Sequence, residues 1–530
     1  MFLKIFQRIF LRYSYVFLVL IIGLSHIYCF FGIDYQDPFY YINFATLAPI
    51  EDTPFMILLS TLATKLAVIL TGGKVLYLRF INLSIYMLSF CLPLLLLKGR
   101  ERAKMALFLA ILIMLFGPFI TNVLGADTFS TLGIVAVACC AVKYLNTQSR
   151  FWFYALIALL SIAMLFRFPN LLLIPVVVLF VTLNAICIKK PKKKYWIEGT
   201  ILIITPLLIS FCIYYLVYGD LSFMVGASNA DQSYELKTLF MSYVFNSISV
   251  IKIMLLLLLA YGFSFVAKKL IFNRFILLTI HIFILSISIV LTYYWVLSGS
   301  LYYRHYGLLL IAIIAIAFIT ASKKNWLKRE MIYVSLVFFL MPIAAAGSNT
   351  GLYKMVYCLP LLLLILRYNS IILQQVFVVF LVALVPLAVY GRINGVFQDE
   401  PIYKLDTVLN LNNLDGIYTT KEKQDNILQI YNKIAVSNSN NIMLLGQSSH
   451  IYKYLKMYKL EYSDFRQKLD FNKIEDFAKS NKTQLIYIDD YPNNTNIKID
   501  DTLRQKIIKL NYRLELFDNY LVINKAKDED

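Results

Sequence analysis

Apolar runs of about twenty residues recur from Tyr13 to Tyr390, and each is long enough to cross roughly 30 Å of hydrocarbon as an α-helix. A helix satisfies its own backbone hydrogen bonds, which a segment surrounded by lipid requires. Hydrophobic residues make up 60% of the 530 residues and charged residues only 15%, a balance outside that of soluble globular proteins. The sequence therefore predicts an α-helical polytopic membrane protein.

The surplus of basic residues belongs to this apolar part of the chain. Residues 391–530 contain 20 basic and 20 acidic side chains, so the net charge of +19 comes entirely from residues 1–390. Short basic loops between membrane spans normally face the cytoplasm. Such clusters lie at Lys4–Arg12, Lys98–Lys104, Lys189–Lys194, Lys268–Arg274 and Lys323–Arg329. This distribution indicates orientation in a membrane and argues against binding to nucleic acid.

Placing these basic clusters on one side of the membrane gives about 13 transmembrane helices. The predicted spans are residues 14–32, 75–97, 105–124, 128–146, 151–167, 169–188, 197–218, 242–266, 275–297, 306–322, 331–346, 352–366 and 371–390. The first run lacks a small-residue cleavage site and is expected to be retained. With a cytoplasmic N-terminus, an odd number of spans places residues 391–530 outside. We therefore predict a multi-pass protein of the cytoplasmic (inner) membrane with an extracytoplasmic C-terminal domain.

One further apolar stretch, Phe55–Leu70, is not assigned as a span. If it crossed the membrane, the basic side chains of residues 98–104 would lie outside. We therefore predict a large first external loop, residues 33–74, with helices that lie along or dip into the membrane surface. The alternative is a protein of fourteen helices with one poorly placed basic loop.

Residues 391–530 lack the long apolar runs and mix helical patterns with short apolar stretches typical of strands. The predicted strands are Asn441–Leu445, Gln484–Ile488 and Tyr520–Ile523. A segment of about 130 residues can bury a core of its own, so we predict a small soluble α/β domain after a transmembrane domain of residues 1–390. All seven cysteines lie in or beside apolar segments, so neither a disulfide framework nor a zinc site is expected.

Two carboxylates, Asp34 and Asp37, directly follow the first span and are the candidate catalytic residues. A carboxylate held near an acceptor hydroxyl can take its proton as a general base. Asp37 precedes Pro38, which is also the pattern of a helix N-cap followed by proline at the first helical position. One residue can serve both purposes, so the sequence leaves both interpretations open.

Short motifs occur at the predicted external ends of the spans. They are Asp37, Tyr41 and Ala45 in the first loop, Leu78-Arg79-Phe80-Ile81-Asn82 at the second span, Gly125-Ala126-Asp127 at the fourth, Arg167-Phe168-Pro169-Asn170 between the fifth and sixth, and Tyr303-Arg304-His305-Tyr306 before a late span. In residue types and order they resemble motifs of the GT-C-fold glycosyltransferases, such as protein O-mannosyltransferases and lipid A aminoarabinose transferases. The resemblance covers residues 1–390 and implies a GT-C-like fold.

In that family the donor is a sugar on a polyprenyl phosphate, and inversion at the anomeric carbon expels the lipid phosphate. The resemblance implies Asp37, with Asp34 as the second candidate, as the catalytic base and cations beside the leaving group. The implied substrate-binding residues are Asp127, Arg167, Asn170, Arg304, His305, Tyr306 and Lys354. The alternative for each basic residue is a side chain that extends from a span end to the membrane interface, and for Asp127 it is a helix cap.

The sequence departs from the family pattern at Pro38, where a second carboxylate often stands. A divalent metal is therefore left open, and no cofactor is assigned. The expected partners are a polyprenyl-phosphate-linked sugar, a lipid, glycan or protein acceptor, and membrane lipids. Two other functions stay open: a transporter or flippase of lipid-linked glycans, and an O-antigen-type polymerase or ligase. A first loop folded as surface helices over a cavity would favour the transferase, and two internally related halves around a central path would favour the transporter.

Overall fold

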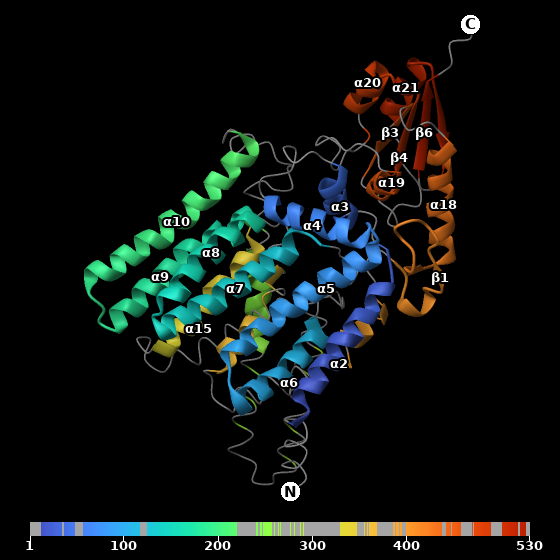
Figure 1. Cartoon of the computed structure of the whole chain (residues 1–530). Helices are drawn as coiled ribbons and strands as arrows, with labels where there is room; N and C mark the ends of the chain where they lie inside the picture. The colour runs from blue at the N-terminus through green and yellow to red at the C-terminus, as the bar shows by residue number, and fades with distance from the viewer. Residues whose placement is uncertain are drawn as a thin grey trace.

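The structure is a computed structural model in which a mainly helical part precedes a small region of β-sheet (Figure 1). It describes residues 12–33, 37–47, 57–116, 124–219, 329–346, 360–367, 399–436, 441–446, 448–456, 469, 471–488, 501–517 and 520–525, with single residues and short stretches between 240 and 290 and between 354 and 394.

The long helices of the first part run side by side as an extended bundle (Figure 1). They are α2 (Ser14–Ile27), α5 (Val75–Cys91), α6 (Gly99–Phe116), α7 (Ala126–Thr147), α8 (Arg150–Phe166), α9 (Leu173–Cys187), α10 (Lys192–Tyr218) and α15 (Arg329–Leu340), with the short α16 (Leu362–Arg367). Tight 3₁₀ turns extend some of them, namely η1 (Tyr28–Phe30), η4 (Leu92–Leu96), η5 (Phe168–Leu172) and η9 (Met341–Ala345). Small residues let α7 and α8 approach closely, because a Cβ atom on Gly133 would lie 3.1 Å from that of Ala163.

Among the described residues, four helices are long and apolar enough to cross a membrane. They are Val75–Leu96, Ala126–Thr147, Phe168–Cys187 and Lys193–Tyr218. Each overlaps a predicted span, so the prediction of apolar helices of membrane-crossing length is confirmed for these four. In the apolar stretch of α7, 78% of the residues are buried inside the protein, against 22% for α10, so α7 is central and α10 peripheral. The exposed side of α10 carries Trp196, Leu208 and Leu216, as a lipid-facing surface requires.

Other predicted spans correspond to shorter apolar helices or lie outside the described residues. Helices at Ser14–Phe30, Arg150–Phe166 and Met331–Ala345 are apolar but have fewer than eighteen residues. The predicted span 306–322 lies outside the described residues, and those at 275–297 and 371–390 lie largely outside them. The count of thirteen helices therefore stays a prediction.

The predicted first external loop contains two helices, α3 (Asp37–Leu47) and α4 (Leu58–Thr71). Helix α4 has 14 residues and is therefore about 21 Å long, too short to cross the hydrocarbon unaided. Ser60 Oγ of α4 donates a hydrogen bond to the carbonyl of Phe166, the last residue of α8. Gly72 ends α4 in the left-handed conformation with φ of 61°. Helix α4 thus lies against one end of the bundle (Figure 1).

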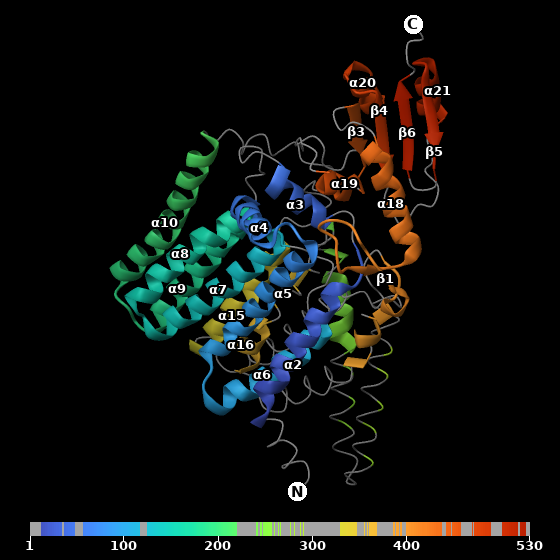
Figure 2. The same cartoon turned by 45° about the vertical axis from the view of Figure 1, so that its right-hand side comes forward.

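A four-stranded sheet with the order β3-β4-β6-β5 forms the end of the chain (Figure 2). Its strands are β3 (Ile442–Leu445), β4 (Gln484–Ile488), β5 (Tyr512–Leu516) and β6 (Tyr520–Lys525). Strands β3 and β4 are parallel, while β6 is antiparallel to both β4 and β5. The three predicted strands are confirmed as β3, β4 and β6. Strand β5 is not among the predictions, although its residues alternate between apolar and charged, which is the pattern of a half-exposed edge strand.

Smaller elements connect the bundle with the sheet and cover the sheet. They are η11 (Ile402–Lys404), β1 (Thr407–Val408), β2 (Tyr418–Thr419), α18 (Lys421–Val436), α19 (Ser449–Lys456), α20 (Phe471–Lys479) and α21 (Asp501–Lys509). Gly446, between β3 and α19, has φ of 95°, and a Cβ atom there would overlap the carbonyl of Ile488 in β4. Only glycine therefore permits the chain to leave β3 beside the end of β4.

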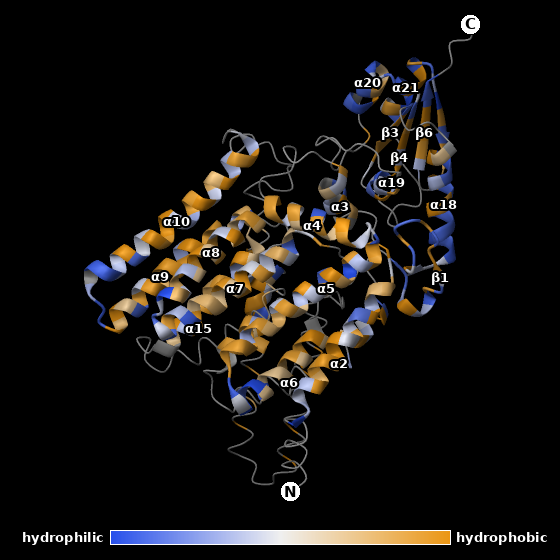
Figure 3. Ribbon diagram, in the orientation of Figure 1, coloured by the Kyte–Doolittle hydropathy of each residue, from blue (hydrophilic) through white to orange (hydrophobic). Residues whose placement is uncertain are grey.

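The two faces of the sheet belong to different cores. Leu485 and Leu521 pack with residues of α20 and α21 in a small separate core. Ile486 and Val522, on the alternate face, belong to the large core that continues into the helical bundle. Figure 3 shows that the bundle is predominantly hydrophobic, whereas the C-terminal region carries many more hydrophilic residues. The C-terminal region is thus packed against the helical part and not merely joined to it by a linker.

Candidate functional site

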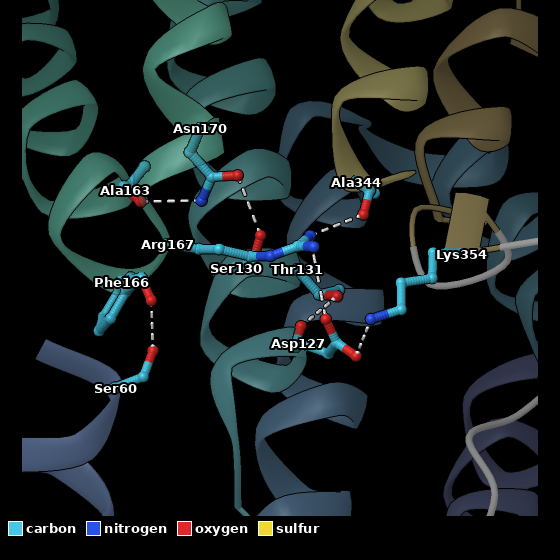
Figure 4. Close-up of polar contacts among 10 residues, drawn as sticks. All are labelled: Ser60, Asp127, Ser130, Thr131, Ala163, Phe166, Arg167, Asn170, Ala344 and Lys354. Carbon is cyan, nitrogen blue, oxygen red and sulfur yellow. Dashed lines mark hydrogen bonds and ion pairs between the residues drawn. The ribbon is translucent and has the colours of Figure 1, made fainter. Parts of the chain in front are cut away.

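Asp127 lies in the first turn of α7, and this helix fixes its position. Gly125 is the N-cap residue, with extended φ and ψ of −158° and −179°, so Asp127 is not the cap that its sequence also allowed. A carboxylate in the first turn is stabilised by the positive end of the helix dipole. The backbone carbonyl of Asp127 accepts a hydrogen bond from Thr131 Oγ1 at 2.8 Å, while its carboxylate points at two basic side chains (Figure 4).

Three charged side chains from distant parts of the sequence meet at this point. Lys354 Nζ donates a hydrogen bond to Asp127 Oδ2 at 2.7 Å, and Arg167 Nη1 lies 3.9 Å from Asp127 Oδ1 (Figure 4). The side chain of Arg167 is 9% exposed, that of Lys354 22% and that of Asp127 28%. Both basic residues are therefore engaged in contacts within the protein. We call Asp127, Arg167 and Lys354 the charged cluster.

Arg167 joins the ends of two helical elements. Its backbone is extended, with φ of −157° and ψ of 117°, between the end of α8 and the start of η5. Pro169 stands in the first turn of η5, where its missing N–H does no harm, and disfavours a continuation of α8. Arg167 Nη1 also donates a hydrogen bond to the carbonyl of Ala344 in η9 at 2.9 Å. One guanidinium thus ties α8 to η9 and faces the carboxylate of the cluster.

Asn170 supports this arrangement from inside the protein. Its Nδ2 donates to the carbonyl of Ala163 at 2.8 Å, and its Oδ1 accepts a hydrogen bond from Ser130 Oγ at 3.0 Å (Figure 4). The side chain is buried, and these two bonds join η5 to α7 and α8. Asn170 therefore holds the elements that carry Arg167, while its predicted contact with substrate stays a prediction.

The motif residues of α5 also reach the start of α7. Thr128 Oγ1, one residue after Asp127, donates a hydrogen bond to Asn82 Oδ1. Arg79, which is 1% exposed, donates from Nη1 to the carbonyl of Cys29 at 3.1 Å and so joins α5 to the end of the first apolar helix. Arg79 is not among the predicted site residues, although an arginine within an apolar helix is itself a signal of a buried polar contact.

Helix α3 reaches the site through a close contact. A Cβ atom on Gly125 would lie 3.1 Å from Cδ2 of Tyr41, so the ring of Tyr41 lies directly against the start of α7. Tyr41 and Gly125 belong to two motifs of the resemblance, and glycine at 125 leaves the room that the ring needs. The structure begins α3 at Asp37, one helical turn before Tyr41, so α3 contacts the start of α7, the helix that carries Asp127.

The charged cluster has the electrostatics of an anion site. Among the described side chains, two cations face one carboxylate, and these three groups together carry a formal charge of +1 in surroundings formed mainly by apolar helices. Such charges interact more strongly there than in water. Because Asp127 and Lys354 are partly exposed, a phosphate oxygen can take the place of the carboxylate as the partner of Lys354. The arrangement can therefore bind an anion and stabilise negative charge that develops on it.

Several predicted site residues lie outside the described part of the chain. They are Asp34, Arg304, His305 and Tyr306. Their assignment stays a prediction, as does the role of the Asp37 carboxylate. Within the described ranges, no three His, Cys, Asp or Glu side chains are grouped as metal ligands.

Comparison of the chain with protein-family models finds no match, and comparison with curated proteins finds none either. The geometry of the site therefore carries the functional argument.

Proposed function

We propose that this protein is a GT-C-type glycosyltransferase of the cytoplasmic membrane, with about 13 transmembrane helices. It moves a sugar from a polyprenyl-phosphate donor to a lipid, glycan or protein acceptor on the extracytoplasmic side. The observation that carries the proposal is the convergence of the motif residues. These residues come from separate parts of the chain and meet at one end of the bundle beside α3. They are Gly125 and Asp127, Arg167 and Asn170, and Lys354.

The contacts at the opposite end of the bundle support the proposed topology. Lys190, from a basic cluster predicted to be cytoplasmic, donates to Gln148 Oε1 at 3.0 Å and to Glu198 Oε1 at 2.7 Å. Tyr144 OH donates to Glu198 Oε2 at 2.9 Å. Gln148 follows α7, whereas Asp127 stands at the start of α7. The ends predicted to be internal thus contact one another, and so do the ends predicted to be external.

In the proposed reaction the acceptor hydroxyl attacks the anomeric carbon from the face opposite the leaving group. A bond forms between that carbon and the acceptor oxygen, and the bond to the phosphate oxygen breaks with its electron pair on the lipid phosphate. The carboxylate of Asp37, or of Asp34, takes the hydroxyl proton. Lys354 and Arg167 stabilise the phosphate charge as it develops. Asp127 holds both cations in place before the donor arrives.

An assay with purified protein and defined polyprenyl-phosphate sugars tests the proposal. We expect release of polyprenyl phosphate that depends on the acceptor, and a product with an inverted anomeric centre. Lys354→Met should weaken this reaction, while Lys404→Met, at an exposed pair with Glu400 in the C-terminal region, should leave it unchanged. Movement of a lipid-linked glycan across proteoliposomes without donor cleavage would overturn the transferase and support the transporter.

A further inference from the structure

The C-terminal region holds the chain just before α3. Gly32 N donates a hydrogen bond to the carbonyl of Tyr418 in β2 at 2.8 Å, and Phe31 forms a parallel bridge with the same residue. The rings of Phe31 and Tyr418 lie 5.6 Å apart. Phe31 and Gly32 thus pair with Tyr418 of the two-stranded sheet of β1 and β2, although nearly four hundred residues separate them from it in sequence.

A buried ion pair completes this attachment. Asp399 Oδ2 accepts a hydrogen bond from the backbone N–H of Ile33 at 2.9 Å and another from Thr419 Oγ1 at 3.0 Å. Lys423 Nζ donates to the carbonyl of Ile33 at 2.8 Å and lies 3.4 Å from Asp399 Oδ2. The side chain of Asp399 is 1% exposed and that of Lys423 3%. Two buried charges therefore bind both backbone groups of one residue, Ile33, which directly precedes Asp34.

Further contacts from α19 hold α3 and the start of α5. Asn43 Nδ2 of α3 donates to the carbonyl of His450 at 2.9 Å. Tyr454 OH donates to the carbonyl of Gly73, and burial raises the pKa of Tyr454 to about 12, so the hydroxyl stays protonated and able to donate. The N–H of Val75 donates to the carbonyl of Asn413 at 2.8 Å. The C-terminal region therefore holds the segment from residue 31 to 75 at both ends and in the middle.

Burial of two opposite charges stabilises a fold only when further hydrogen bonds compensate for the loss of water. Here the compensating bonds include the backbone of Ile33, outside the C-terminal region. The sheet of β3 to β6 has a core with α20 and α21, whereas the hydrogen bonds of the pair given above go to Ile33 and to Thr419 in β2, which belongs to the other, two-stranded sheet. The pair is therefore placed to fix the first external segment, not the fold of the sheet.

We propose that Asp399 and Lys423 are positioning residues for sugar transfer: they fix the backbone at Ile33, and with it the start of α3 at Asp37, relative to the charged cluster. This inference rests on the proposed transferase function, because the fixed position of α3 matters here only for the transfer reaction. It makes the C-terminal region a part of the catalytic unit, although it supplies none of the residues assigned to the reaction. Neither residue touches substrate in this scheme.

The test uses the full-length protein and the variants Lys423→Arg, Asp399→Asn and the double variant Asp399→Asn with Lys423→Met. The double variant removes both charges, so no unpaired charge is left buried. Lys506→Met is the matched control, since Lys506 forms an ion pair with Glu475 on α20, away from Ile33. The readouts are kcat and KM for the donor, and hydrogen exchange measured separately for residues 31–47 and for the sheet.

For the double variant we expect kcat to fall roughly a hundredfold, as for misplacement of a reacting group by about 1 Å, while KM for the donor changes by less than about threefold. Exchange at residues 31–47 should accelerate by about tenfold or more, with the sheet unchanged. Asp399→Asn keeps an acceptor for Ile33 N–H but leaves the Lys423 charge buried without its counter-charge, so we expect the same changes to at least the same degree. Lys423→Arg should keep most of the turnover, and Lys506→Met should match the unmodified protein.

Normal turnover in the double variant would overturn the positioning role and leave the transferase function intact. Lost protection of the sheet together with residues 31–47 would also overturn it, because the pair would then support the whole C-terminal fold. Absence of donor cleavage in the unmodified protein would overturn the proposed function, and the positioning role for transfer with it.

Discussion

The charged cluster of the bundle and the buried ion pair of the C-terminal region use the same residue types in different surroundings. The exposed fractions of Asp127 and Lys354 are 28% and 22%, whereas those of Asp399 and Lys423 are 1% and 3%. Charges that are buried and bonded to the backbone hold the chain in place. Charges that are partly exposed can exchange a protein partner for a ligand. We therefore assign ligand binding to the pair of Asp127 and Lys354 and positioning to the pair of Asp399 and Lys423.

The largest expected effect is on folding stability and separates the two groups directly. Lys423→Met leaves the Asp399 carboxylate buried without its cation and should lower the free energy of unfolding by about 3–5 kcal/mol. Lys354→Met removes a partly exposed partner and should lower it by about 1 kcal/mol or less. Denaturant unfolding in detergent measures both values. Equal losses would mean that burial does not distinguish the two pairs.

The next effect concerns the candidate base. Asn is a good N-cap but cannot accept a proton at neutral pH, so Asp37→Asn should leave folding intact and reduce transfer by roughly a hundredfold or more. Membrane abundance and turnover of the variant are the two measurements. If Asp37→Asn stays active while Asp37→Ala disappears from the membrane, Asp37 is a cap, and the base should be sought at Asp34 or Asp127.

A smaller effect is expected on donor binding. Lys354→Met should weaken the affinity for the polyprenyl-phosphate sugar by about 1.5–3 kcal/mol, because a hydrogen bond to a charged phosphate is lost. Lys190→Met is the control: Lys190 forms a similar ion pair with Glu198 at the opposite end of the bundle. Titration of purified protein with donor gives both affinities. A similar loss in both variants would move the donor site away from the charged cluster.

The smallest effect tests the contact of α3 with α7. Gly125→Ala would place a Cβ atom 3.1 Å from the Tyr41 ring, so the ring and α3 must shift by a few tenths of an ångström. We expect a loss of about 1 kcal/mol in stability and a severalfold loss of turnover. Gly23→Ala in α2 is the control, because no atom lies within 4 Å of its Cβ position. Unchanged turnover in Gly125→Ala would mean that the reaction does not depend on the contact of α3 with α7.

The residues of the charged cluster were predicted, but most of their contacts were not, and this difference has a physical explanation. The resemblance implies Asp127, Arg167, Asn170 and Lys354 as substrate-binding residues. The structure brings Arg167 and Lys354 to Asp127, and Asn170 holds the elements that carry Arg167. Their hydrogen bonds to Ala163, Ala344 and Ser130 were not predicted. Those bonds join helix ends through backbone carbonyls and a hydroxyl, groups that occur throughout the sequence and mark no position in it.

By itself the sequence determined the apolar helices of membrane-crossing length, because hydrocarbon requires about twenty apolar residues per helix. It also determined three strands of the C-terminal sheet. It also determined which polar residues stand at the ends of the helices. Only the tertiary structure decided that the C-terminal region binds the segment before α3. The contact between Ile33 and Asp399 spans 366 positions, and one buried carboxylate on one backbone N–H leaves no periodic pattern in the chain.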